Sequence, residues 1–107
     1  MAKKSVKKIT LEIAKKYLFI LRKNKINLKK VYIFGSFAKG IPYKDSDIDI
    51  AIVSDNFTGD WINDRLILMR LRREVDLSIE PHPFLPEEFD KTNPFVNEII
   101  RTGIRIK

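Results

Sequence analysis

Apolar residues recur at helical spacing in the first part of the chain. Between residues 5 and 23 they return every three or four positions, which predicts an amphipathic helix. A polar break follows, and the apolar run of residues 31–34, which ends at Gly35, is typical of a short buried strand. Glycine and proline then leave room for at most one helical turn before a second strand over residues 47–53.

A capped helix is predicted after the second strand. Asp60 directly precedes residues 61–73, and its carboxylate can accept hydrogen bonds from the first helical turn. Within this segment we expect Ile62, Leu66, Met69 and Arg73 to lie along one face of the helix.

The remaining third of the chain contains a further strand and short helical segments. Residues 75–80 alternate between apolar and polar side chains, which predicts a third strand, and Pro81 and Pro83 are expected to close it. The last predicted elements are a helical turn at 86–89, a helix over 93–102 that Gly103 stops, and a short edge strand over 104–107. The pattern predicts one α/β (α+β) domain over residues 1–107, with a small mixed sheet flanked by helices.

Length and composition limit the classes of protein that fit. With 107 residues, 44% of them apolar, the chain has room for one small folded domain. The absence of cysteine excludes a disulfide scaffold and a thiolate metal site, and with one histidine the carboxylates are the only candidate metal ligands. No apolar run is long enough for a membrane span or a signal peptide, so we expect a cytoplasmic protein without membrane partners.

Charge is distributed unevenly along the chain. Residues 1–30 hold eleven basic residues against Glu12, a net charge of +10, whereas the whole chain carries +7 and the remainder therefore −3. Two interpretations of this basic arm are open. It is either a solvated helix face or a docking surface for phosphates of nucleic acid or for an acidic partner.

Three aspartates are expected on one face of the sheet. Strand alternation separates Asp47 and Asp49 from the neighbouring isoleucines, and Asp76 takes the matching face of the third predicted strand. Two carboxylates that lie two positions apart on a strand, as Asp47 and Asp49 do, repel each other by about 2 to 3 kcal/mol at an effective dielectric near 20. The third carboxylate adds to the repulsion. A hard divalent cation offsets the repulsion at neutral pH, and oxygen ligands favour Mg²⁺ or Mn²⁺.

A candidate phosphate cradle lies upstream of the aspartates. Gly35 lets the backbone approach an anion closely, and Ser36 adds a hydroxyl donor at the start of a turn. A P-loop is excluded, because Ile41 and Pro42 occupy the positions that would need lysine and serine or threonine. Magnesium keeps coordination positions for phosphate oxygens, so the combination predicts a phosphorylated substrate.

The sequence from Gly35 to Asp49 resembles the signature of the DNA polymerase β-like nucleotidyltransferases, which is Gly-Ser, ten residues, then Asp-x-Asp. In length the chain is similar to the minimal nucleotidyltransferases, which are usually paired with a helical HEPN-domain toxin. The resemblance implies that Asp47 and Asp49 bind two Mg²⁺ ions that bridge a nucleoside triphosphate. It also implies that Asp76 completes the metal site and helps to activate the attacking hydroxyl, and that Gly35 and Ser36 hold the β and γ phosphates.

The activity implied by the resemblance is nucleotidyl transfer to a protein. AMP from ATP would pass to a hydroxyl of a HEPN toxin, a tyrosine in the expected case, and the chain would act as the antitoxin. The alternatives are an antitoxin that works by stoichiometric binding, a transferase that acts on RNA or a small molecule, and a nucleic-acid-binding module that uses the basic arm. A homodimer and a hetero-complex with the partner both fit the small core.

Two single residues are open to more than one interpretation. His82, between two prolines, is expected in an exposed loop, and the alternative is a role near the nucleotide base or the metal. Trp61 is expected to anchor the start of its helix by packing, and the alternative is a stacking platform for a base.

Overall fold

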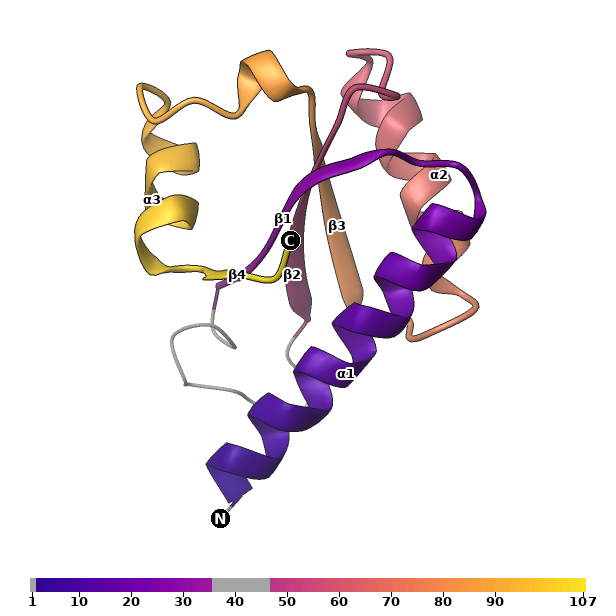
Figure 1. The fold of residues 1–107 in the computed structure, drawn as a ribbon, viewed down its shortest axis with the longest axis vertical. Helices are drawn as coiled ribbons and strands as arrows, with labels where there is room; N and C mark the ends of the chain where they lie inside the picture. Colours follow the sequence, from indigo (N-terminus) through magenta and orange to yellow (C-terminus); the bar gives the residue numbers. More distant parts are fainter. Residues whose placement is uncertain (1, 36–46) are drawn as a thin grey trace.

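The computed structural model describes residues 2–35 and 47–107 (Figure 1). The helices and strands follow one another in the order helix, two strands, helix, strand, short helices and a final strand. Their bounds are α1 Ala2–Lys23, β1 Leu28–Phe34, β2 Ile48–Ser54, α2 Trp61–Arg72, β3 Ile79–Phe84, the 3₁₀ turn η1 Pro86–Glu88, α3 Pro94–Thr102 and β4 Ile104–Arg105.

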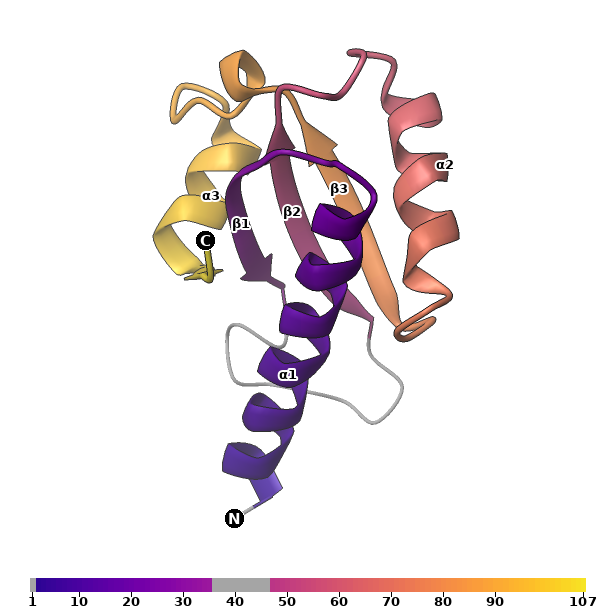
Figure 2. The same cartoon turned by 45° about the vertical axis from the view of Figure 1, so that its right-hand side comes forward.

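The four strands form one mixed sheet in the order β3-β2-β1-β4. Strand β1 runs antiparallel to β2 and β4, whereas β2 and β3 are parallel. Helices α1 and α2 cover one face and α3 lies on the other (Figures 1 and 2). The predicted fold class, a small mixed sheet flanked by helices, is confirmed.

Strand alternation produces a separate apolar core on each face of the sheet. On the α1 and α2 side, the isoleucines of β2 pack with Leu68 and with buried residues of α1. On the α3 side, Ala51 and Val53 of β2 pack with Val96 and Ile99. Since Asp49 alternates with the isoleucines, the α3 side is also the side on which its carboxylate lies.

Capping residues fix the helix ends that the sequence predicts. The Asp60 side chain accepts a hydrogen bond from the Asn63 amide at 3.2 Å, and α2 begins at the next residue. Asn93 caps α3 in the same way, accepting from the amide of Phe95 at 2.9 Å, and Gly103 is the C-cap residue. These side chains satisfy amides that have no partner within the helix.

The prediction for the third strand is wrong in its bounds. Residues 75–78 form turns, and β3 runs from Ile79 to Phe84 through both prolines that were expected to close it. Proline is tolerated because β3 is an edge strand. The Ser78 carbonyl accepts from the Ile48 amide of β2 at 2.8 Å. Backbone groups alternate in direction along a strand, so those of residues 79, 81 and 83 point away from β2 to the outer edge. The missing amide hydrogens of Pro81 and Pro83 therefore cost the sheet no hydrogen bond.

The outer edge of β3 is also occupied by arginine side chains of α2. Arg72 donates to the Ile79 carbonyl at 2.7 Å, and Arg65 donates to the Pro81 carbonyl at 3.2 Å. The same two guanidiniums form ion pairs with Glu80. These contacts hold α2 against β3 where proline supplies no backbone donor.

The face of α2 predicted to be apolar is the exposed face. Ile62 and Leu66 retain 66% and 58% of their accessible surface, whereas Leu68 and Asp64 are buried. Trp61 is 53% exposed, so the expectation of a packing anchor is wrong. The side of the helix that faces the core carries Leu68, which is fully buried, and Leu71, which packs against the same cluster.

A buried hydrogen bond joins the two helices on this side of the sheet. The Tyr17 hydroxyl of α1 donates to the Leu68 carbonyl of α2 at 2.7 Å. Burial raises the pKa of the Tyr17 hydroxyl well above its ordinary value, and the nearby Arg72 offsets part of the effect. Among the described residues, no helix has the length and apolar character needed to cross a membrane.

Candidate functional site

The predicted site residues converge on one end of the sheet. Phe34, the last residue of β1, pairs with Asp49 near the start of β2, and Gly35 follows directly. Asp47 immediately precedes β2, and Asp76 lies in the turn that leads into the parallel strand β3. The topology therefore brings Gly35 and all three aspartates to the same end of three neighbouring strands.

Gly35 and Asp49 are in close contact. Gly35 has a φ of +78°, a conformation that side chains with a Cβ rarely adopt. A Cβ placed on Gly35 would lie 2.5 Å from Oδ2 of Asp49, well inside van der Waals distance. The absence of a side chain at residue 35 therefore leaves the space that one oxygen of the Asp49 carboxylate occupies.

The other oxygen of Asp49 contacts a residue of the neighbouring strand. His82 Nε2 lies 3.1 Å from Oδ1 of Asp49, and the exposed fractions of the two side chains are 24% and 31%. The His82 ring packs edge-on against Phe34, with centroids 4.9 Å apart, and lies near Phe95. The expectation of an exposed loop histidine is wrong, because His82 is a half-buried residue of β3.

The strand that places His82 beside Asp49 can be recognised in the sequence from its alternating pattern, but its two prolines argue against a strand. Residues 79–84 alternate strictly, with Ile79, Pro81 and Pro83 buried and the residues between them half-buried. Prolines at the buried positions indicate a strand end when the position of the strand in the sheet is unknown. Once the segment is known to be an edge strand, the same alternation places His82 on the Asp49 face.

Asp76 lies in a turn and not in a strand. Its Oδ1 accepts from the Ser78 amide at 2.8 Å and from the Ser78 hydroxyl. Asp47 is exposed. The reasoning that placed Asp76 on a strand face is therefore wrong, although the residue lies at the predicted end of the sheet.

The donor chemistry of the three aspartates suits a hard cation, but their side chains are not assembled into a metal site. Carboxylate oxygens are the ligands that Mg²⁺ prefers, and Oδ2 of Asp49 lies beside the Gly35 backbone. Across residues 2–35 and 47–107, however, no three His, Asp or Glu side chains form a group that could hold a metal ion. In this arrangement Asp76 accepts from the Ser78 amide, and Asp49 lies against His82.

Ser36, the second residue of the predicted phosphate cradle, lies outside the described residues. The cradle therefore stays a prediction, of which the structure describes Gly35.

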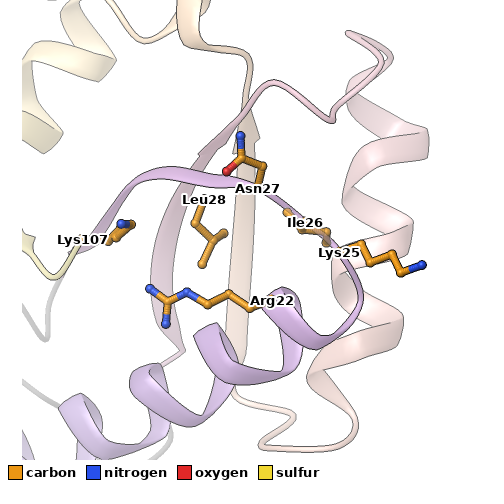
Figure 3. A pocket seen from close by; sticks show the side chains of 6 residues that line it. All are labelled: Arg22, Lys25, Ile26, Asn27, Leu28 and Lys107. Carbon is orange, nitrogen blue, oxygen red and sulfur yellow. The ribbon is translucent and has the colours of Figure 1, made fainter.

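A hollow of about 350 Å³ lies at the other end of β1, where α1 ends (Figure 3). Its lining includes Arg22, Lys25 and Lys107 and no acidic side chain. Arg22 extends along the hollow toward Lys107, while Lys25 points away from it. This basic surface is remote from Asp49 along β1, and Lys15 and Lys16 of the basic arm are exposed, as a solvated helix face requires.

Comparison with curated proteins identifies a relative with a named activity. Over 66 residues the chain is 35% identical to the protein adenylyltransferase MntA of Shewanella oneidensis. The match covers 58% of this chain and 47% of the relative, so the chain spans about half the length of that protein.

Two solved structures share the fold. A proposed nucleotidyltransferase from Sulfolobus solfataricus is similar over 98% of this chain and 86% of its own, with a TM-score of 0.70 and 21% identity. A toxin-antitoxin crystal structure with AMP-PNP matches 82% of this chain and 67% of its own, with a TM-score of 0.59 and 22% identity. At these identities the likeness concerns the fold.

A family model covers most of the chain and agrees with the arrangement of the sheet. The model described as "Polymerase beta, Nucleotidyltransferase" matches residues 15–107, which include every element from the middle of α1 to β4. The matched segment contains Gly35 and the three aspartates at the end of the sheet. The chain therefore belongs to the polymerase β family of nucleotidyltransferases.

Proposed function

We propose that this protein transfers AMP from ATP to a hydroxyl of a partner protein, a tyrosine of a HEPN-type toxin, and thereby acts as an antitoxin. The named activity of the Shewanella relative, protein adenylyltransferase, supports the reaction type. The toxin-antitoxin structure with AMP-PNP, which shares the fold, supports an adenine nucleotide as the substrate and a toxin as the partner. Family membership supports nucleotidyl transfer in general.

The contact of Gly35 with Asp49 carries the proposal. A half-exposed carboxylate at a strand start, next to a glycine without room for a Cβ, is an arrangement that core packing does not require. It leaves one carboxylate oxygen beside a backbone that can approach an anion closely. Asp47 and Asp76 at the same sheet end supply two further carboxylates for cation binding.

In the proposed reaction the acceptor hydroxyl oxygen forms a bond to the α phosphorus of ATP. The bond from that phosphorus to the bridging oxygen breaks, and pyrophosphate leaves. Asp47 and Asp49 are proposed to hold Mg²⁺, and Asp76 would join them by turning from Ser78 and would help to take the hydroxyl proton. Bound Mg²⁺ would neutralise the triphosphate charge and orient the reacting oxygens.

The proposal is tested with ATP that carries a radioactive label on either the α or the γ phosphate. The purified protein is incubated with Mg²⁺ and a lysate of its source cells, and proteins are separated by size. We expect a labelled protein band from α-labelled ATP only. Substitution Asp49→Asn should remove at least about 99% of the label, because it removes the negative charge with which residue 49 would hold the Mg²⁺ that stabilises the transition state.

Asp55→Asn is the matched control for that experiment. Asp55 lies just after β2, at the end opposite Asp49, and it is exposed. The same chemical change there should leave transfer unchanged. Label from γ-labelled ATP alone would indicate phosphoryl transfer, because that reaction moves only the terminal phosphate. Neutralisation of a HEPN toxin by Asp49→Asn protein at one equivalent would favour the stoichiometric binder.

A further inference from the structure

The outer face of α2 combines exposed apolar side chains with two adjoining hollows. One hollow, of about 70 Å³, is lined by Trp61, Ile62, Arg65, Leu66 and Met69. The second, of about 250 Å³, is lined by Leu66, Met69, Arg70, Arg72 and Arg73. Because Leu66 and Met69 line both, the two hollows adjoin along the helix, and together they are called the α2 groove below.

The apolar half of the α2 groove is exposed to solvent. Trp61, Ile62 and Leu66 are each more than half exposed, and contiguous apolar surface of this kind marks interaction sites. Arg65 lies over the Trp61 ring, with 5.4 Å between its guanidinium carbon and the ring centroid. The ring is therefore held in place by a cation–π contact, which lowers the entropy cost of binding against it.

The other half of the groove carries positive charge that the described part of the chain does not neutralise. Arg70 and Arg73 are exposed, and neither forms an ion pair with a described acidic residue. Arg72, between them in sequence, pairs with Glu80 on β3. The groove thus runs from an apolar end at Trp61 to a basic end at Arg73.

We propose that the α2 groove binds an amphipathic helix of a partner protein, with apolar side chains against Trp61 and Leu66 and acidic side chains against Arg70 and Arg73. A second helix is the occupant that fits, because side-chain ridges of one helix pack into the groove of another over several turns. Acidic residues on the partner would complement the basic end and exclude basic competitors.

Most of this surface lies apart from the candidate active site. Helix α2 covers one face of the sheet and α3 the other (Figure 2), and Asp49 lies on the α3 face. The basic end of the groove adjoins the site, where the Asp76 amide donates to the Arg72 carbonyl at 2.9 Å. The proposal does not depend on nucleotidyl transfer, and each can fail without the other.

Selection from a displayed library of helical peptides tests the proposal. The library varies one helix face over apolar, acidic, basic and neutral residues, and the full chain is the immobilised target. Selected peptides are synthesised and titrated against the protein while the fluorescence of Trp61, the single tryptophan, is recorded. We expect selected peptides that combine apolar residues at three- and four-residue spacing with Asp or Glu, and a blue shift of the Trp61 emission.

Two variants locate the binding surface. Leu66→Glu places a charge in the apolar half of the groove, and the double variant Arg70→Glu with Arg73→Glu reverses the basic end. Each should weaken binding of the selected peptides by at least about tenfold. All three residues are exposed, so the variants should fold normally. The double variant Lys30→Glu with Arg105→Glu, on β1 and β4, makes the same charge change away from α2 and should leave affinity within about twofold.

Several outcomes would overturn the proposal. These are no enrichment of any peptide, enrichment without a bias toward Asp and Glu, or equal binding of selected peptides to Leu66→Glu protein. Sedimentation of the protein alone is the remaining measurement. A dimer that Leu66→Glu dissolves would assign the groove to a second copy of this chain instead of a partner helix.

Discussion

At the scale of single residues, the Asp49 carboxylate is fixed by contacts on both of its oxygens. Oδ1 lies beside His82 on the neighbouring strand, and Oδ2 occupies the space left by the missing side chain of Gly35. The aspartate is thus oriented before any ligand arrives. Pre-orientation of this kind reduces the reorganisation that binding a cation or phosphate demands.

Gly35→Ala should abolish nucleotidyl transfer, whereas Gly59→Ala should not. Both glycines have positive φ, +78° and +90°, so alanine strains the backbone by about 1 to 3 kcal/mol at either position. Only at Gly35 does the new Cβ collide with Asp49, since the nearest atom at Gly59 is a Leu85 methyl at 3.4 Å. Urea unfolding and α-label transfer measured on both variants separate strain from activity, and equal activities would contradict the site.

His82→Phe should lower transfer activity by about 10- to 100-fold, the usual effect of losing a residue that orients a metal ligand. Phenylalanine keeps the aromatic contacts with Phe34 and Phe95 and removes the hydrogen bond to Asp49. The Mg²⁺ concentration for half-maximal activity should rise, which a loss of stability alone would not cause. His82→Gln, with an amide donor, should recover part of the activity, and an unchanged Mg²⁺ requirement in His82→Phe would disprove the role.

At the scale of helices and strands, local sequence signals predicted most elements. They failed where the bounds or the buried face of an element depend on its position in the folded protein. Caps at Asp60 and Asn93 fix α2 and α3, because a side-chain oxygen satisfies helix amides wherever the helix lies. The bounds of β3 could not be predicted, because proline ends a central strand but not an edge strand. The buried face of α2 could not be predicted either, because Leu68 packs into the core while Ile62 and Leu66 stay exposed.

For the candidate site, the sequence predicted the sheet end but not the contacts. Gly35 and the three aspartates converge as the motif implies, because β1, β2 and the approach to β3 all meet there. The hydrogen bond that Asp76 accepts from the Ser78 amide is a turn contact that strand alternation cannot predict. The contact of His82 with Asp49 depends on the register of β3 against β2, in which His82 pairs with Ala51.

Asp64→Ala should destabilise the fold more than Asp60→Ala, although both carboxylates lie at the start of α2. Asp64 is 3% exposed and accepts from the Thr58 amide, the Thr58 hydroxyl and the Gly59 amide. Its loss should cost about 2 kcal/mol, because a charged acceptor of several hydrogen bonds is removed. Loss of the Asp60 cap should cost about 1 kcal/mol. Urea denaturation gives both values, and the reverse order would refute this reading of the loop.

At the scale of the whole molecule, α1 and α2 are connected by the buried Tyr17 hydroxyl. Its hydrogen bond to Leu68 crosses from the first helix to the second, over 51 positions in sequence. Both residues belong to the core on the isoleucine face. The contact therefore ties the basic N-terminal helix to the rest of the domain.

Stability should fall as pH rises above about 10, the usual pKa of tyrosine in an unfolded chain. Burial raises the pKa of Tyr17, so the folded state keeps a proton that the unfolded state loses. The free energy of unfolding then decreases by up to about 1.4 kcal/mol per pH unit above that point and is unaffected by this group below it. Urea unfolding between pH 8 and 11.5 should show a shallower decline for Tyr17→Phe, and parallel curves would contradict the burial argument.

The prolines and arginines at the edge of β3 also protect the protein from aggregation. An open strand edge is a template on which other chains can add strands, and fibrils grow in this way. On β3, Pro81 and Pro83 offer no outward amide, and the outward carbonyls of Ile79 and Pro81 already accept from arginines. The edge therefore lacks the outward donors of two residues, and two of its outward carbonyls are occupied, so intermolecular sheet growth is disfavoured there. The far edge, at the two-residue β4, is left as the side where chains could join.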